Sequence, residues 1–361
     1  MGISIVNYDT LKCIQTQGKT EDTPNLNRIG CGTILYVCPC NKKGMYSIPY
    51  GVTNIQKAAF SDCSKLSYIS IPSSVSEVAM YTFVQCSELS SVVISSNISN
   101  LNNYAFYICN KLSLVIYLGE STSGSSSIFV NCPVLAEIHV LPTYGSDLFC
   151  SRWRVKRCIS NSSCGDSTKY IFDQNTGNLY VSGKGAISDY TNDLAPWSSY
   201  KHDIISVIIE GEVSSVGNNC FSECTGLTSV TIISSSIESL GESTFSGCSN
   251  LEKITFQEGA NLSIIGESTF YGCSNLESIS IPSSVTEIGK EAFKECKSLR
   301  NITFQEESNL SIIGESSFYG CSNLESISIP SSVLEIRNRT FYYCSNLENI
   351  TFKEKSKLTI I

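Results

Sequence analysis

The sequence predicts a β-rich solenoid in which short parallel strands, tight turns and 3₁₀-like segments coil around one continuous core. The main observation is a pattern, Phe-x-x-Cys-x-x-Leu-x-x-Ile/Val-x-apolar, that occurs ten times in 361 residues. Within two groups the copies recur at intervals close to 23 residues, typical of one supersecondary unit per repeat stacked against its neighbours. The copies begin at Phe60, Phe83, Phe106, Phe129, Phe221, Phe245, Phe270, Phe293, Phe318 and Phe341. Because stacked repeats offer an extended surface, we expect binding rather than catalysis.

One well-formed unit, Phe270–Glu291, shows how each repeat produces a short strand. Leu276, Ile279 and Ile281 are expected to point inward, with a polar residue between the two isoleucines. Pro282 ends the strand because its nitrogen cannot donate a ladder hydrogen bond. Too few residues remain for a helix before the next phenylalanine. We therefore expect the outer side of each coil to consist of strand and turn.

Ten of the 18 cysteines occupy one position of the repeat and predict a column of buried thiols. Side chains at the same phase of successive coils stack about 4.8 Å apart. Cysteine packs as a small hydrophobe, so we interpret the column as reduced core. A straight column offers no convergent ligands, and no metal is expected there. The repeat cysteines are Cys63, Cys86, Cys109, Cys132, Cys224, Cys248, Cys273, Cys296, Cys321 and Cys344.

The repeats form two arrays with a different segment between them. The first array is expected over residues 32–150 and the second over residues 207–361, whereas residues 1–31 form a poorly defined N-terminal segment. Residues 151–206 are predicted to contain a linker and a β-hairpin capping module.

The second array also contains a longer repeat of 48 residues. Residues Phe245–Ala292 and Phe293–Thr340 are identical at 34 of 48 aligned positions, and Phe341 opens a third copy. That copy stops at Ile361, part-way through a coil. We interpret the chain as a fragment or a truncated gene model, with apolar side chains and unpaired strand edges exposed at its last coil.

Between the arrays, two alternating segments predict a hairpin. Tyr170–Phe172 and Asn178–Gly183 are separated by a polar, glycine-containing turn. Pro196, Trp197 and other large aromatics follow, so the hairpin is expected to seal the first coil of the second array. Basic residues precede the hairpin and are interpreted as a solvated linker, with an anion or polysaccharide site as the alternative. They are Arg152, Arg154, Lys156 and Arg157.

Composition argues against several classes of function. A net charge of −8 disfavours nucleic acid as a partner, because phosphate binding needs clustered Lys and Arg. No apolar run approaches the ~20 residues of a membrane span, so no membrane insertion is expected. The two histidines, His139 and His202, have no credible nucleophile partner, and no catalytic, cofactor or metal site is predicted.

Several motifs resemble BspA-like leucine-rich-repeat surface proteins. The coil Ile281–Gly289 matches the family repeat closely, and 32–36 and 48–55 resemble its opening coil. The family's entry module is similar to Cys164–Asp166, Thr176–Leu179, Val181–Ala186, Pro196–Trp197 and Ile208–Gly211. The resemblance implies a leucine-rich-repeat solenoid of the α/β horseshoe class. It also implies a cell-surface or secreted, adhesin-like protein that binds a protein or glycan, including host matrix or cell-surface proteins.

Location remains open at this point. The N-terminus has no visible signal peptide and the chain has no membrane anchor, so an intracellular, cytoplasmic scaffold for protein–protein interaction is the alternative. The sequence leaves the disulfide state of eight cysteines undecided: Cys13, Cys31, Cys38, Cys40, Cys150, Cys158, Cys164 and Cys220. Free Cys150, Cys158 and Cys164 would favour the cell interior, and a bridge among them would favour secretion.

The predicted binding surface is the strand face. In the second array the outward positions form a hydroxyl column, namely Thr231, Thr255, Ser280, Thr303, Ser328 and Thr351. In the first array the corresponding positions are more apolar, and they predict a partner-binding patch unless a loop covers them. The patch consists of Tyr68, Val93, Leu114, Ile116 and His139. Seven Asn-x-Ser/Thr sequons weakly favour secretion; they lie at Asn97, Asn161, Asn261, Asn301, Asn309, Asn338 and Asn349.

Overall fold

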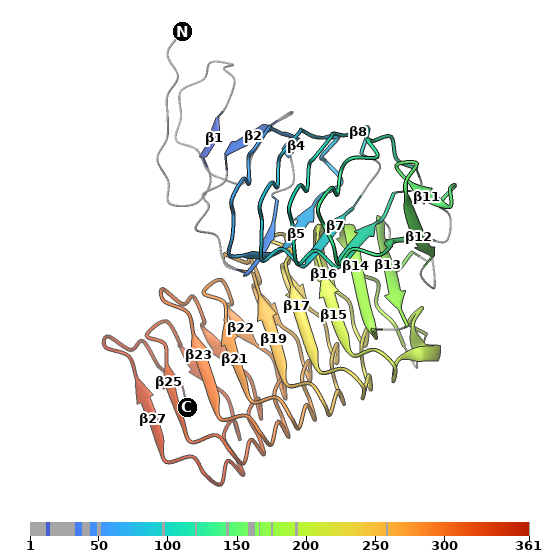
Figure 1. Cartoon of the computed structure of the whole chain (residues 1–361). Helices are drawn as coiled ribbons and strands as arrows, with labels where there is room; N and C mark the ends of the chain where they lie inside the picture. Colours follow the sequence, from blue (N-terminus) through green and yellow to red (C-terminus); the bar gives the residue numbers. More distant parts are fainter. Residues whose placement is uncertain are drawn as a thin grey trace. The chain divides into compact units, whose positions relative to one another are not determined.

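The computed structural model forms two compact units, Met1–Ile159 and Ser160–Ile361. Figure 1 follows the chain through both units by colour. The structure describes residues 12–14, 33–37, 44–48, 52–95, 98–119, 121–141, 144–157, 163–165, 167–174, 176–191, 194–257 and 259–360. Cys31, Cys38, Cys40, Cys158, Asn97 and Asn161 lie outside these ranges, as does most of the segment 1–31.

The first unit is a solenoid with two sheets, one on each side of its coils. The larger sheet has the order β11-β12-β10-β9-β7-β5-β3, and the second has the order β1-β2-β4-β6-β8. The strands of the larger sheet are β3 (Gly44–Ser47), β5 (Leu66–Ile71), β7 (Ser91–Ile94), β9 (Leu114–Tyr117), β10 (Ile138–Val140), β11 (Leu148–Phe149) and β12 (Trp153–Arg157). Those of the second are β1 (Lys12–Ile14), β2 (Thr33–Val37), β4 (Val52–Ile55), β6 (Glu77–Val78) and β8 (Asn100–Leu101).

The second unit repeats this arrangement with more coils. One row of parallel strands contains β15 (Ser206–Ile209), β17 (Ser229–Ile232), β19 (Lys253–Phe256), β21 (Ser278–Ile281), β23 (Asn301–Phe304), β25 (Ser326–Ile329) and β27 (Asn349–Phe352). The opposite row contains β16 (Glu212–Val216), β18 (Ser239–Leu240), β20 (Ile264–Ile265), β22 (Glu287–Ile288), β24 (Ile312–Ile313) and β26 (Glu335–Ile336). Among the described residues the only helix is the 3₁₀ turn η1 (Ser198–Tyr200). The expectation of strand and turn on the outer side is confirmed.

The predicted hairpin is present and begins both rows of the second unit. Strand β13 (Ser167–Asp173) pairs antiparallel with β14 (Asn178–Ala186), and β14 pairs in parallel with β15 and then with β16. The strand changes rows near Gly183, whose φ is +137°. A Cβ there would lie 2.2 Å from the backbone oxygen of Ser167, so only glycine fits.

Trp197 continues the capping module into the core. Its Nε1 donates a hydrogen bond to the Cys220 carbonyl oxygen at 2.7 Å. Its ring stacks on Phe221 with centroids 4.9 Å apart and an interplanar angle of 7°. The tryptophan therefore takes the place of a repeat phenylalanine ahead of the first complete coil.

The core of each unit is built from the residues that define the repeat. Successive phenylalanines stack, for example Phe270 on Phe293 with centroids 5.1 Å apart. Each repeat thiol beyond the first coil donates to the phenylalanine carbonyl of the preceding coil, as Cys273 Sγ does to Phe245 O at 3.2 Å. The described repeat cysteines carry no disulfide, and all but Cys344 are buried. The prediction of a reduced, buried column is confirmed.

Residues Trp153–Arg157 were predicted to belong to a solvated linker, which is wrong: they form β12, which pairs in parallel with β10. The period of two is present, since Trp153 and Val155 alternate with Arg154 and Lys156, but the run is short and most of its residues are basic. At the last coil, Ile350 and Phe352 are exposed, as predicted. Ile360 is exposed as well, but it holds the same outward position as Ile264, which is exposed in a middle coil.

Candidate partner-binding surfaces

The predicted patch of the first array is in register but not exposed. Ser70, Val93, Ile116 and His139 are direct neighbours across β5, β7, β9 and β10. Val93 and Ile116 are 0% exposed, Tyr68 is 5% exposed and His139 is 8% exposed, while Leu114 is half-buried.

The expectation that these residues lie on a solvated face is therefore wrong. Tyr68, Val93 and Ile116 are absent from the interior cluster of the coils, which agrees with their outward register. A period of two identifies the face of a strand, but it cannot tell whether other residues cover that face. Contact of this patch with a partner stays a prediction.

Charged groups border this patch at its β10 end. His139 Nε2 and Lys156 Nζ each lie 3.9 Å from Glu137 Oε1. His139 and Lys156 are paired neighbours on β10 and β12. The carboxylate of Glu137 thus faces two groups that can carry positive charge.

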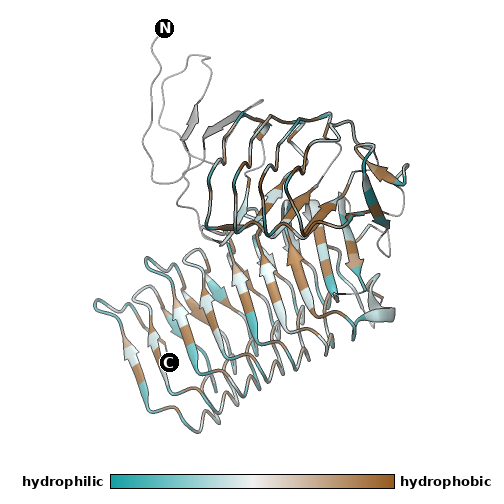
Figure 2. Ribbon diagram, viewed as in Figure 1, coloured by the Kyte–Doolittle hydropathy of each residue, from teal (hydrophilic) through white to brown (hydrophobic). Residues whose placement is uncertain are grey.

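The strand face of the second array is exposed and uncharged over most of its area. The predicted hydroxyl column is in register, since Thr231 pairs with Thr255, Ser280 with Thr303, and Ser328 with Thr351. A second column beside it contains Ser229, Lys253, Ser278, Asn301, Ser326 and Asn349. From β21 to β27 every member of both columns is exposed. Figure 2 shows the resulting alternation of pale and brown bands along these strands.

Five sequons lie on the described surface. Asn301 and Asn349 belong to the strand face itself, and Asn261, Asn309 and Asn338 lie elsewhere; all five are exposed. A glycan on Asn301 or Asn349 would obstruct a ligand on that face, so binding through this face requires both asparagines to be unmodified.

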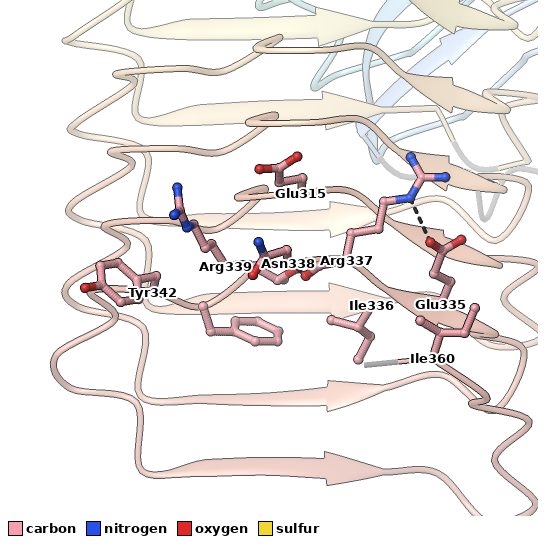
Figure 3. Close-up of a pocket in the computed structure, with 10 residues that line it drawn as sticks. Glu315, Glu335, Ile336, Arg337, Asn338, Arg339, Tyr342 and Ile360 are labelled. Atoms are coloured by element: carbon pink, nitrogen blue, oxygen red, sulfur yellow. Dashed lines mark hydrogen bonds and ion pairs between the residues drawn. The ribbon is translucent and has the colours of Figure 1, made fainter.

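A hollow of about 820 Å³ opens at the last coil of the second unit (Figure 3). Ile336, Phe341 and Ile360 supply its apolar wall. Arg337 Nε donates to Glu335 Oε1 at 3.0 Å at its rim. Ile336 and Phe341 occupy repeat core positions, whereas Ile360 holds the outward position next to Glu335.

Tyrosines gather on the turns before and after the repeat phenylalanines, and the sequence analysis did not single them out. Tyr81 and Tyr104 stack with centroids 5.4 Å apart, and Tyr107 meets both rings edge-on. In the second unit Tyr271, Tyr319 and Tyr342 occupy the position directly after the phenylalanine. That fixed offset from the phenylalanine is the signal that would have revealed them.

The described residues offer few groups suited to metal binding or nucleophilic catalysis. Between residues 44 and 360, gaps excepted, no group of three or more His, Cys, Asp and Glu is arranged to hold a metal ion. His202 Nδ1 lies 2.8 Å from Thr225 Oγ1, and no carboxylate is recorded with it in this part of the chain. Burial raises the pKa of the Cys150 and Cys164 thiols to about 11 each, which disfavours the nucleophilic thiolate.

Within the described segments, no helix has the length and apolar character needed to cross a membrane.

Comparison with known proteins establishes the family. The model of the BspA type leucine-rich repeat region matches in six copies, over residues 38–153, 198–308 and 263–361. The chain belongs to the BspA-type leucine-rich repeat family. This confirms the predicted resemblance and the leucine-rich-repeat solenoid, and the family suggests a protein-binding repeat protein.

Solved structures of leucine-rich repeat proteins are similar to this chain. The Treponema (T. pallidum) protein TpLRR is 24% identical, with 51% of this chain and 79% of that chain covered and a TM-score of 0.39. A Bacteroides ovatus protein is 20% identical, with 99% of both chains covered and a TM-score of 0.37. A leucine-rich cell surface protein of Faecalibacterium prausnitzii is 17% identical, covers 98% and 96%, and has a TM-score of 0.32. No curated protein matches the chain.

Proposed function

We propose that this chain is a non-enzymatic, adhesin-like protein of the cell surface that binds a protein or glycan partner. The proposed binding surface is the strand face of the second array, from β21 to β27. The observation that supports it is the exposed, in-register pair of columns made of hydroxyl and amide side chains.

The chemistry of this face suits a neutral or weakly charged partner surface. Ser, Thr and Asn side chains are short, so little rotamer freedom is lost when they form hydrogen bonds. Neighbouring strands place such groups about 4.8 Å apart, which gives repeated donors and acceptors along the array. Exposed Glu277, Glu325 and Glu348 lie just ahead of β21, β25 and β27 and add an acidic border, which the exposed Arg300 interrupts ahead of β23. Such a border favours a partner with complementary positive charge at its rim.

A matched pair of substitutions tests the proposal. Thr303→Glu places a charge in the centre of the strand face, whereas Thr286→Glu makes the same exchange at an exposed turn beside the opposite row. We expect Thr303→Glu to weaken capture of the partner by the full chain from host-cell extracts and surface glycans by at least tenfold, with an unchanged Tm. Equal capture by both variants would refute this assignment.

The predicted patch of the first array is a separate proposal with its own test. If Ile116 contacts a partner, Ile116→Glu weakens binding without unfolding the protein. Because Ile116 is buried, we expect the opposite result, a large fall in Tm. Such a fall would show that Ile116 stabilises the folded structure.

An intracellular scaffold with the same fold is the second candidate function. The observation that favours it is that Cys150 and Cys164 are both free and buried. Labelling of the protein on intact cells decides between the two: accessible protein supports the adhesin-like role, and protein that is labelled only after permeabilisation supports the scaffold.

A further inference from the structure

The turn edge of the first array carries a compact aromatic cluster, which we call the tyrosine cluster: Tyr81, Tyr104 and Tyr107. The rings of Tyr81 and Tyr104 are nearly parallel, at 7°. The Tyr107 centroid lies 5.6 Å from that of Tyr104 and 6.4 Å from that of Tyr81. With the stacked centroids 5.4 Å apart, these distances place Tyr107 beside the stack and not beyond it. All three side chains are half-buried.

The backbone at this cluster is strained. Tyr81 and Tyr104 have φ values of +59° and +56°, in the left-handed region that bulky residues rarely adopt. The same position, two residues before the phenylalanine, is left-handed in the second array, where small or polar residues occupy it. They are Asn219, Ser243, Ser268, Glu291, Ser316 and Arg339. The left-handed turn is therefore a property of the repeat, and two adjacent coils of the first array place large, stacked rings on it.

Tyrosine ring faces on the turns of each unit already hold cations. Lys57 Nζ lies 5.9 Å from the centroid of Tyr81. In the second array Lys294 Nζ lies 5.6 Å from the Tyr271 ring and 5.2 Å from the Tyr319 ring. Glu291 Oε1 completes that site at 3.0 Å from the ammonium. Two sites in the chain thus show that the faces of these tyrosine rings accept a lysine ammonium group.

One face of the tyrosine cluster is still available. Tyr81 covers one face of Tyr104, and Tyr107 lies at the side of the stack. On the other face, the next coil presents Ser127, whose backbone oxygen accepts a hydrogen bond from Tyr104 N at 3.0 Å. Within the described part of the chain, no ring or ammonium is recorded on that face. The Arg152 guanidinium donates to the carbonyl oxygen of the adjacent Ser126 at 3.2 Å and is recorded over the Trp153 ring.

We propose that the outer face of Tyr104, above Ser127, binds a Lys or Arg side chain of a basic protein partner. This rests on the proposed function in that it assumes a protein partner, and it names the partner's chemistry and a second contact surface. The net charge of −8 favours a basic partner at long range. A cation over one ring strengthens binding about threefold when exposed and about thirtyfold when desolvated.

The test uses the full chain with ¹³C-labelled tyrosine and follows the Tyr104 ring signal by NMR. The probes are octalysine, octalysine acetylated at every Nε, and maltohexaose. We expect octalysine alone to shift the signal. Equal shifts with the acetylated peptide would overturn the proposal in favour of hydrogen bonding. A shift with maltohexaose instead would overturn it in favour of sugar stacking.

Variants then separate the ring from the general charge of the chain. Tyr104→Phe retains the ring and is expected to bind octalysine like the wild type. Tyr104→Asn leaves the net charge unchanged and accepts a left-handed backbone; we expect three- to thirtyfold weaker binding with an equal or higher Tm. Unchanged octalysine affinity in this variant contradicts the proposal.

A second pair of variants keeps the test valid if Tyr104→Asn folds poorly. Ser127→Lys places an ammonium of the chain itself beneath the Tyr104 face and should abolish octalysine binding. Ser268→Lys adds the same charge on the turn edge of the second array and should not. Equal binding by both variants refutes the site, while the Thr303→Glu experiment still judges the strand face independently.

Discussion

The phenylalanine stack makes a quantitative prediction about the second array. Phe270 is fully buried and lies between Phe245, at 5.6 Å, and Phe293, at 5.1 Å. Replacement by alanine removes two stacked ring pairs, each contributing about 0.5–1.5 kcal/mol, and leaves a cavity in a core that relaxes only partly. We expect Phe270→Ala to lower the free energy of unfolding by about 4 kcal/mol.

The neighbouring residue supplies the control for this experiment. Tyr271 is 37% exposed and its ring contact is with the Lys294 ammonium, so Tyr271→Ala should lower the free energy of unfolding by less than about 1 kcal/mol. Urea unfolding is followed by far-UV circular dichroism and by fluorescence of the chain's two tryptophans, which include Trp197 in the capping module. If coils are coupled to their neighbours, Phe270→Ala shifts the Trp197 transition as well. Equal losses in the two variants would refute the stacking argument.

Three further predictions follow from the thiols and glycines. Burial raises the pKa of Cys248, so a thiol reagent at pH 8 should leave it unmodified until urea unfolds the chain; the half-buried Cys344, with a pKa raised to about 11, should react earlier. Since the folded pKa of such thiols lies above the unfolded value near 9.0, their stabilisation is complete below pH 9 and declines as pH rises; a free energy of unfolding independent of pH from 8 to 11 would contradict this. Gly183→Ala should lower the free energy of unfolding by about 1–3 kcal/mol, because the φ of Gly183 is strained and a Cβ would clash. Gly185→Ala should lower it less, because a Cβ there meets open space. Urea titration compares the two variants, and the reverse order would disprove the reasoning.

The interior of the fold was predictable because each coil repeats the same pattern of buried residues. A phenylalanine, a thiol and alternating aliphatic residues at fixed spacing have one common solution, in which they converge on the inside of a coil. The hairpin was equally readable, since its polar turn separates two alternating segments. Strand β12 was not, because Arg154 and Lys156 alternate with residues that pack only partly against the core.

The surface was less predictable than the core. Register placed Val93 and Ile116 on the outward face, and that much agrees with the structure. The structure buries them, and no local period encodes whether an outward face is covered. The tyrosine cluster was missed for a related reason: Tyr81 and Tyr107 lie 26 positions apart, and only coiling brings their rings together.

The sequence by itself determined the coil, its period, the buried column of thiols and the family to which the chain belongs, because these properties arise from spacing along the chain. The tertiary structure alone decided which outward residues remain in contact with water and which aromatic rings accept a cation. Those properties depend on distances between coils and on whether an outward face is covered, and the order of neighbouring residues specifies neither.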